Sequence, residues 1–152
     1  MTLENYLKNN KIESIGPSPE SAKVKLTKAF KFLKNIKKME GVVDNEIIYP
    51  SAHDASRLAC EAILFLSGYR VKKNIEASHY IIIDCAKELA GENLNLEFIR
   101  FQRMRKTRNQ LEYGNLDSIS GSDIGQAIKD LEKLLIYARG LMEKSENKDK
   151  LV

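Results

Sequence analysis

Arg108 is the residue whose type and position are most suggestive of chemistry, because it stands where an apolar side chain is expected. On a helical wheel of about 100° per residue it falls in the middle of an apolar arc, between Met104 and Leu111. A guanidinium in such a place must be paired or hydrogen-bonded, since an unpaired buried charge is costly. Two interpretations follow: an ion pair with Glu112 or with an acid of another helix, or a cleft that Arg108 lines.

Two stretches of the chain carry basic residues with no acid between them. The stretch that ends at Arg108 is mostly arginine, which suits bidentate contact with phosphate. We therefore predict that it supplies a phosphate- or nucleic-acid-binding surface, through Arg100, Arg103, Arg105 and Lys106. The other stretch, residues 23–38, holds seven lysines, and a solvated helix face is its simpler explanation. Outside these stretches the chain carries 13 basic and 21 acidic residues, so the sequence predicts an acidic body with two basic faces.

The two histidines differ in their predicted surroundings. His79 lies on an apolar stripe with Ile75 and Ile82, where a core histidine is the usual outcome, and His53 lies off the stripe of its own helix and is expected in solvent. We treat both, with Glu112, as candidates to support the site around Arg108. Two histidines and two cysteines without ligand spacing predict no metal and no cofactor. The cysteines are expected to be buried and reduced.

The elements that must position these residues are helices. Apolar residues recur at helical spacing in five segments, which we place at residues 19–40, 50–66, 75–90, 94–113 and 122–143. Short connections between them predict an all-α fold, an antiparallel up-down helical bundle of four to five helices. We expect residues 1–17 to form an arm, residues 18–143 the bundle, and residues 144–152 a frayed tail.

Composition excludes several classes of protein. A chain of 152 residues with 43% hydrophobic residues is the size of one domain and is large enough to fold without disulfides. The net charge of +4 permits an anionic partner. No apolar run approaches the ~18 residues of a membrane span, and the N-terminus lacks the pattern of a signal peptide. We therefore expect a cytoplasmic protein that does not act at a membrane.

The stretch from Arg108 to Tyr113, Arg-Asn-Gln-Leu-Glu-Tyr, resembles the signature of HEPN domains, small all-α proteins of prokaryotic toxin–antitoxin and defence systems. That signature is an Arg followed by a polar residue, often Asn, and closed by a His. The Ala-rich segment of residues 52–66, the loop after it and His79 also resemble this family. The similarity covers roughly residues 20–142 and implies a HEPN-like bundle.

The resemblance implies roles for particular residues. Active HEPN proteins are metal-independent endoribonucleases that dimerise, so that two copies of the motif face one cleft. By position, Arg108 would hold the scissile phosphate and Asn109 would orient it. Tyr113 stands at the earliest place for the motif His, and a phenol with a pKa near 10 is a poor general base at neutral pH. Tyr113 could instead stack on a base or hydrogen-bond a phosphate.

Three functional hypotheses follow. The leading one is a HEPN-like RNA- or nucleotide-binding protein, dimeric, with weakened or absent nuclease activity. The second is an active ribonuclease toxin in which His79 or His53 replaces the missing His. The third is a non-catalytic subunit that docks a minimal nucleotidyltransferase or an antitoxin partner, and gene neighbourhood would separate it from the others. The sequence leaves open whether the protein is an enzyme.

Overall fold

A computed structural model describes residues 1–114 and 118–150 of the chain, the last two without their side chains. The described part contains six helices and two three-residue strands, which confirms the all-α prediction but gives one helix more than the four to five expected, because the N-terminal arm forms α1. In chain order these elements are α1 (Leu3–Lys8), β1 (Ile12–Ser14), α2 (Pro19–Met39), α3 (Asn45–Ser67), β2 (Tyr69–Val71), α4 (Ser78–Ala90), α5 (Asn95–Glu112) and α6 (Gly121–Lys150).

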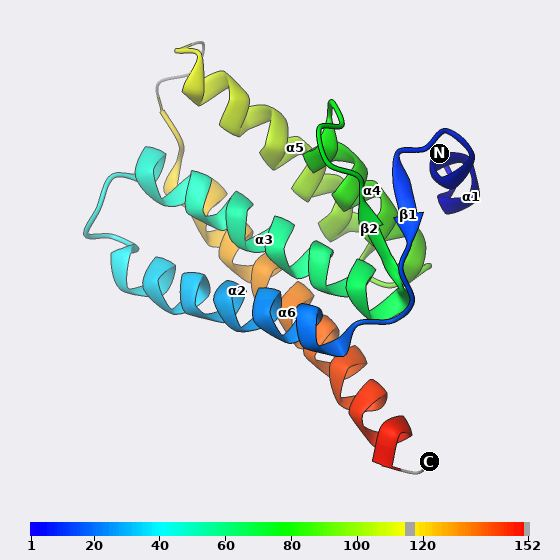
Figure 1. Cartoon of the computed structure of the whole chain (residues 1–152). Helices are drawn as coiled ribbons and strands as arrows, with labels where there is room; N and C mark the ends of the chain where they lie inside the picture. The colour runs from blue at the N-terminus through cyan, green and yellow to red at the C-terminus, as the bar shows by residue number, and fades with distance from the viewer. Residues whose placement is uncertain (115–117, 151–152) are drawn as a thin grey trace.

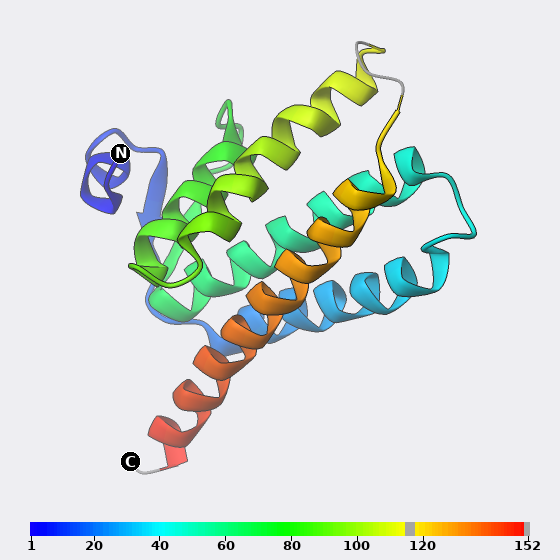
Figure 2. The ribbon, with the colours of Figure 1, turned by 180° about the vertical axis from the view of Figure 1, so that it is seen from behind.

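The helix α3 lies at the centre of the molecule and contacts α2, α4, α5 and α6 (Figure 1). It has small and branched apolar residues around most of its circumference, so neighbours can approach it closely from several sides. α2 returns along it as an antiparallel hairpin partner, and α6 packs against both. α4 and α5 cover the remaining side, and the C-terminal part of α6 extends beyond the other helices (Figure 2).

The start of α3 differs from the prediction. The sequence indicated a start near Pro50, but the helix begins at Asn45 and Pro50 lies inside it. Pro50 stands in the second turn of α3, where it removes the one backbone hydrogen bond that would reach the carbonyl of Glu46. The first turn is held from outside: Asn45 donates to the carbonyl of Ile119, and Glu46 accepts from the amide of Ile119, at 2.9 and 3.0 Å.

The other helix ends are close to the predicted ones, with two further differences. α4 begins at Ser78, three residues later than predicted. α6 begins at Gly121, one residue before the predicted start, and Ser120 caps it: the Ser120 hydroxyl accepts from the amide of Asp123 while Asp123 accepts from the amide of Ser120. The segment expected to be a frayed tail continues α6 as helix from residue 144 to Lys150, and residues 151–152 of it lie outside the described part.

The N-terminal arm is docked on the bundle. β1 pairs with β2 in antiparallel register. The sequence did not indicate this small sheet, because strands of three residues are too short to show an alternating pattern. Tyr6 of α1 is buried and donates to Asp84 of α4 at 2.6 Å. Gly68 allows the closest approach, because a Cβ there would lie 3.0 Å from the backbone of Gly16 and its φ is +89°.

Both cysteines are buried and free, as predicted. Burial raises the pKa of the Cys85 thiol to about 12, so it stays protonated at neutral pH. Among the residues described, no helix combines the length and the hydropathy needed to cross a membrane.

Candidate phosphate-binding site

Arg108 lies on α5 facing α3, and an acid of that other helix is its partner. Nη2 of Arg108 is 3.6 Å from Oδ1 of Asp54, with 28% of the Arg108 side chain exposed. In the described part of the chain this guanidinium makes no hydrogen bond, because the ion pair is too long to count as one. Glu112, the other acid considered from the sequence, is exposed. The guanidinium is therefore held loosely and keeps donors available.

The charge of Arg108 acts on both histidines, which lie close to each other. His53 on α3 and His79 on α4 have ring centroids 5.7 Å apart, with the ring planes tilted by 49°. His79 is half-buried, whereas His53 is fully buried, so the prediction that His53 is solvated was wrong. The reason is that α3 is covered on several sides, so a residue off its main apolar stripe still faces another helix.

His53 is an unusual buried group. Neither of its ring nitrogens has a hydrogen-bond partner in the described part of the chain. Burial, followed by the positive charge of Arg108, lowers the pKa of His53 to about 3. Burial and the charges of Arg57 and Arg108 also lower the pKa of His79. Both imidazoles are therefore neutral at physiological pH, and each has one nitrogen that can accept a proton or a hydrogen bond.

Two more arginines complete the cluster. Arg57 lies on α3, one turn after His53, and pairs with Glu61 at 2.8 Å. Arg105 of α5 lies over the ring of Tyr80, 5.4 Å from its centroid, and its charge also lowers the pKa of His53. We call these residues the arginine–histidine cluster: His53, Arg57, His79, Arg105 and Arg108. Two carboxylates, Asp54 and Glu61, accompany its three guanidinium groups.

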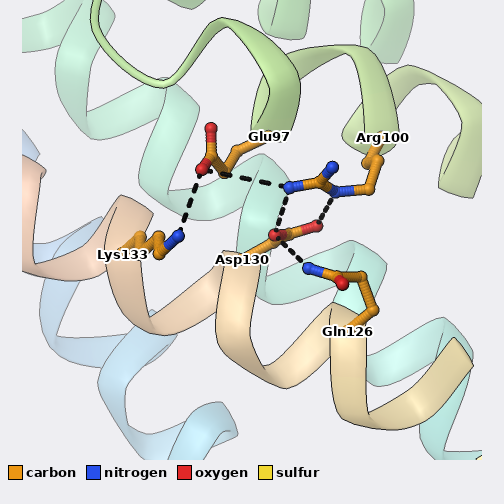
Figure 3. Close-up of polar contacts among 5 residues, drawn as sticks. All are labelled: Glu97, Arg100, Gln126, Asp130 and Lys133. Carbon is orange, nitrogen blue, oxygen red and sulfur yellow. Dashed lines mark hydrogen bonds and ion pairs between the residues drawn. The ribbon is translucent and has the colours of Figure 1, made fainter. Parts of the chain in front are cut away.

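Arg100 does not join this cluster. Its guanidinium makes a bidentate pair with Asp130 of α6, at 2.6 and 2.9 Å, and Asp130 is almost completely buried (Figure 3). Gln126 donates to the same carboxylate at 2.9 Å, and Glu97 lies between Arg100 and Lys133. Arg100 therefore links α5 to α6, a structural role that the arginine-rich pattern did not indicate.

The remaining predicted residues point elsewhere or into solvent. Arg103 lines a separate cavity of about 270 Å³ between α5, α3 and α6, together with Asp130. Lys106 and Asn109 are exposed, and Tyr113 at the end of α5 is 77% exposed. The structure thus brings Arg105 and Arg108 together with the two histidines, but it does not bring Arg100, Arg103 or Lys106 to the same place.

Sequence reasoning missed the contribution of α3. Asp54, Arg57 and Glu61 are spaced by three and four residues, so they share one face of a helix whose other residues are mostly small and apolar. That spacing was a usable signal, because a polar face on an Ala-rich central helix must meet polar groups of its neighbours.

The sequence was compared with models of protein families and with curated proteins, and the structure was compared with solved structures. The chain matches no model of a known protein family and no curated protein, and the structure matches no solved structure. In the described residues, no group of three or more potential ligands is arranged to hold a metal ion.

Proposed function

We propose that the protein is a HEPN-like RNA- or nucleotide-binding protein that holds a phosphate of its ligand at Arg108, with weakened or absent endoribonuclease activity. One observation carries this proposal: the guanidinium of Arg108 is loosely paired and partly exposed, and its charge lowers the pKa of a buried histidine whose ring nitrogens have no partner among the described residues. A phosphodiester would supply acceptors for the guanidinium, and a ribose hydroxyl could hydrogen-bond the neutral imidazole of His79, which is half-buried.

The pair with Asp54 does not prevent such binding. Ion pairs that are partly exposed contribute about 0–1 kcal/mol, whereas hydrogen bonds that involve a charged group contribute about 1.5–3 kcal/mol. A phosphate that makes two hydrogen bonds with Arg108 can therefore displace Asp54. Arg57 and Arg105 raise the local positive potential and favour the approach of an anion.

The residues at the exposed end of α5 argue for weakened or absent catalysis, and they offer the ligand a second contact. Tyr113 stands where the resemblance places a His, and a phenol is a poor base at neutral pH. Its exposure leaves the ring free to stack on a base. Asn109, also exposed, would orient the phosphate. We further propose a homodimer, which would bring two copies of Arg108 to one cleft, and a place in a toxin–antitoxin or defence system.

The test is RNA binding by the full chain at two salt concentrations. Fluorescence anisotropy with a labelled single-stranded RNA should show affinity falling as salt rises. Arg108→Ala should lower affinity about tenfold or more and reduce the slope of log K against log salt by about 0.7. Arg139→Ala is the matched control, because Arg139 lies over the ring of Phe30 on another part of the bundle. Equal affinities of Arg108→Ala and Arg139→Ala would contradict the proposal.

A second candidate function, an active metal-independent ribonuclease, is favoured by the position of His79. This neutral imidazole lies beside His53, and the charge of Arg108 helps to lower its pKa. It could take the proton of a ribose 2′-OH while O2′ attacks phosphorus, forming a 2′,3′-cyclic phosphate. The bond from phosphorus to the 5′-oxygen then breaks, and that oxygen takes a proton from water.

Cleavage of labelled RNA in the presence of EDTA tests this second candidate. We expect an active protein to lose at least about 100-fold in rate with His79→Asn, because general base catalysis contributes about 10²–10⁴-fold. The rate of cleavage by the His53→Asn variant shows whether His53 contributes to catalysis independently of His79. If the wild-type protein binds RNA and leaves it intact, the binding proposal stands and the ribonuclease is excluded.

A further inference from the structure

A large cavity lies next to the arginine–histidine cluster. It has a volume of about 900 Å³ and lies between the second half of α3, β2 and the start of α4. Arg57 and His79 belong both to its lining and to the cluster. Its size is typical of a site for a small molecule or for one residue of a polymer.

One wall of this pocket is apolar and aromatic. Phe65 at the end of α3 and Tyr69 of β2 line it, with Ile75 and Ile82 from the loop and helix that follow. Both aromatic rings are partly exposed. Rings in that state can stack on a flat heterocycle, and stacking tolerates any base because every base has a π-face.

The rest of the lining carries more positive than negative charge. Five basic residues line the pocket against two acids, Glu13 and Glu61. Lys73 is exposed and has no ion pair in the described part of the chain. Nε of Arg57 is buried and donates to no acceptor there. This combination suits a ligand that has both a ring and a negative charge.

The spacing along α3 connects the pocket to Arg108. Asp54 contacts Arg108, and Arg57 and Glu61, which follow on the same face, line the pocket. At 1.5 Å per residue, Arg57 lies about 4.5 Å and Glu61 about 10 Å along the helix from Asp54. A ligand phosphate at Arg108 therefore lies within reach of a ring placed in the pocket.

We infer that this pocket receives the base of the nucleotide that adjoins the phosphate held at Arg108. The inference rests on the proposed function, and it adds the part of the ligand that the pocket selects. The base would stack against Tyr69 or Phe65, and Lys73 would face the next phosphate of the chain. Single-stranded RNA is the ligand class that offers an unpaired base beside a phosphodiester.

The experiment measures anisotropy with two short single-stranded RNAs, one intact and one that lacks all bases. Wild-type protein should bind the intact RNA at least about fivefold more tightly than the abasic one. Tyr69→Leu and Phe65→Leu together should remove most of this difference and leave abasic binding unchanged. Phe32→Leu, on the outer side of α2, is the aromatic control. Thermal unfolding of each variant shows whether it folds.

Lys73→Glu keeps the inference testable if the aromatic variants do not fold. It should weaken binding of both RNAs, whereas Lys23→Glu on α2 should not. The inference is overturned, and the proposed function kept, if Arg108→Ala weakens binding while the Tyr69, Phe65 and Lys73 variants bind as wild type does. If wild-type protein binds neither RNA, or Arg108→Ala changes nothing, the proposed function fails and the inference with it.

Discussion

At the scale of single residues, His53 costs stability at the place where the protein would use it. A buried polar group without a hydrogen bond costs about 1–3 kcal/mol relative to one that is satisfied. Here both ring nitrogens lack a partner, and the ring lies beside a second histidine and three arginines. Unsatisfied buried groups and perturbed pKa values of this kind are frequent at functional sites.

We predict that His53 makes the protein less stable in acid. Its pKa is about 3 in the folded protein and near 6.5 in the unfolded chain, so only the unfolded chain takes up the proton between those values. Stability is therefore full above pH 6.5 and falls as pH falls toward 3, with a loss of about 2 kcal/mol at pH 5 from this residue. Urea unfolding at pH 7 and pH 5 measures the loss.

His53→Leu removes the titrating group and is the variant to compare. It should lose less stability than wild type between pH 7 and pH 5, and at pH 7 it should be as stable as wild type or more so, because the unsatisfied nitrogens are gone. His79→Leu should have a smaller effect, since His79 is only half-buried. An unchanged pH dependence in His53→Leu would show that His53 is satisfied in the folded protein.

At the scale of elements, the ion pair between Arg100 and Asp130 fixes α5 against α6. We predict that Asp130→Ala lowers the free energy of unfolding by about 2–3 kcal/mol, because Arg100 loses a nearly buried bidentate partner. Hydrogen exchange of the α5 amides should become faster, since this pair is a main link between the two helices. Chemical denaturation and exchange measured on the same variant check both effects.

Glu132→Ala is the control for that prediction, because Glu132 lies on the same helix in an exposed pair with Lys37. Such a pair contributes about 0–1 kcal/mol, so its loss should change the free energy of unfolding very little. The double variant Arg100→Met/Asp130→Leu should recover much of the lost stability. If Asp130→Ala were as mild as Glu132→Ala, α5 would be held by its apolar contacts alone.

Most of the helices could be predicted from the sequence, but the packing of the helices against one another could not. The spacing of Leu26, Ala29 and Leu33 sufficed for α2, and the stripe of α6 was as clear. α3 was misjudged twice, at its start and at His53. Both errors have one cause: the contacts of Ile119 with the first turn of α3 and the covering of its sides come from segments distant in the sequence.

The candidate site was predictable only in part. Arg108 could be recognised because a charge in an apolar arc demands a partner, and an acid of another helix proved to be that partner. The arginine run suggested one surface, yet residues 100 and 103 face α6 or a separate cavity and residue 105 faces α4. The composition gives only the number of charges. The direction of each side chain depends on its position around the helix and, for Arg100, on the buried carboxylate of Asp130.

At the scale of the whole molecule, the two basic stretches lie on opposite sides of the bundle. α2 and α5 are separated by α3 and α6 in both views (Figures 1 and 2). Lys25 and Lys37 of α2 pair with acids on α3 and α6, and the other lysines of that stretch have no ion pair among the described residues. A ligand bound at Arg108 would therefore meet the α5 stretch and, of the α2 stretch, only Lys25, which lines the pocket.

We therefore predict that charge reversal acts on RNA binding through α5 and hardly through α2. Arg105→Glu should lower affinity by more than tenfold at physiological salt. Lys28→Glu/Lys31→Glu should lower it less than threefold, because charges beyond the Debye length of about 8 Å are screened. The anisotropy assay described for Arg108 measures both. A large loss with the lysine variant would mean that RNA wraps around the bundle and reaches α2.

The docked N-terminal arm has a consequence for how the protein is made. Tyr6 bonds with Asp84 across 78 positions of sequence, and β1 needs β2 before it can pair. At about 5–20 residues per second, the ribosome completes the arm about 4–16 s before its partners exist. The arm therefore cannot dock until β2 and α4 have been synthesised, and the pocket wall that contains Glu13 forms only then.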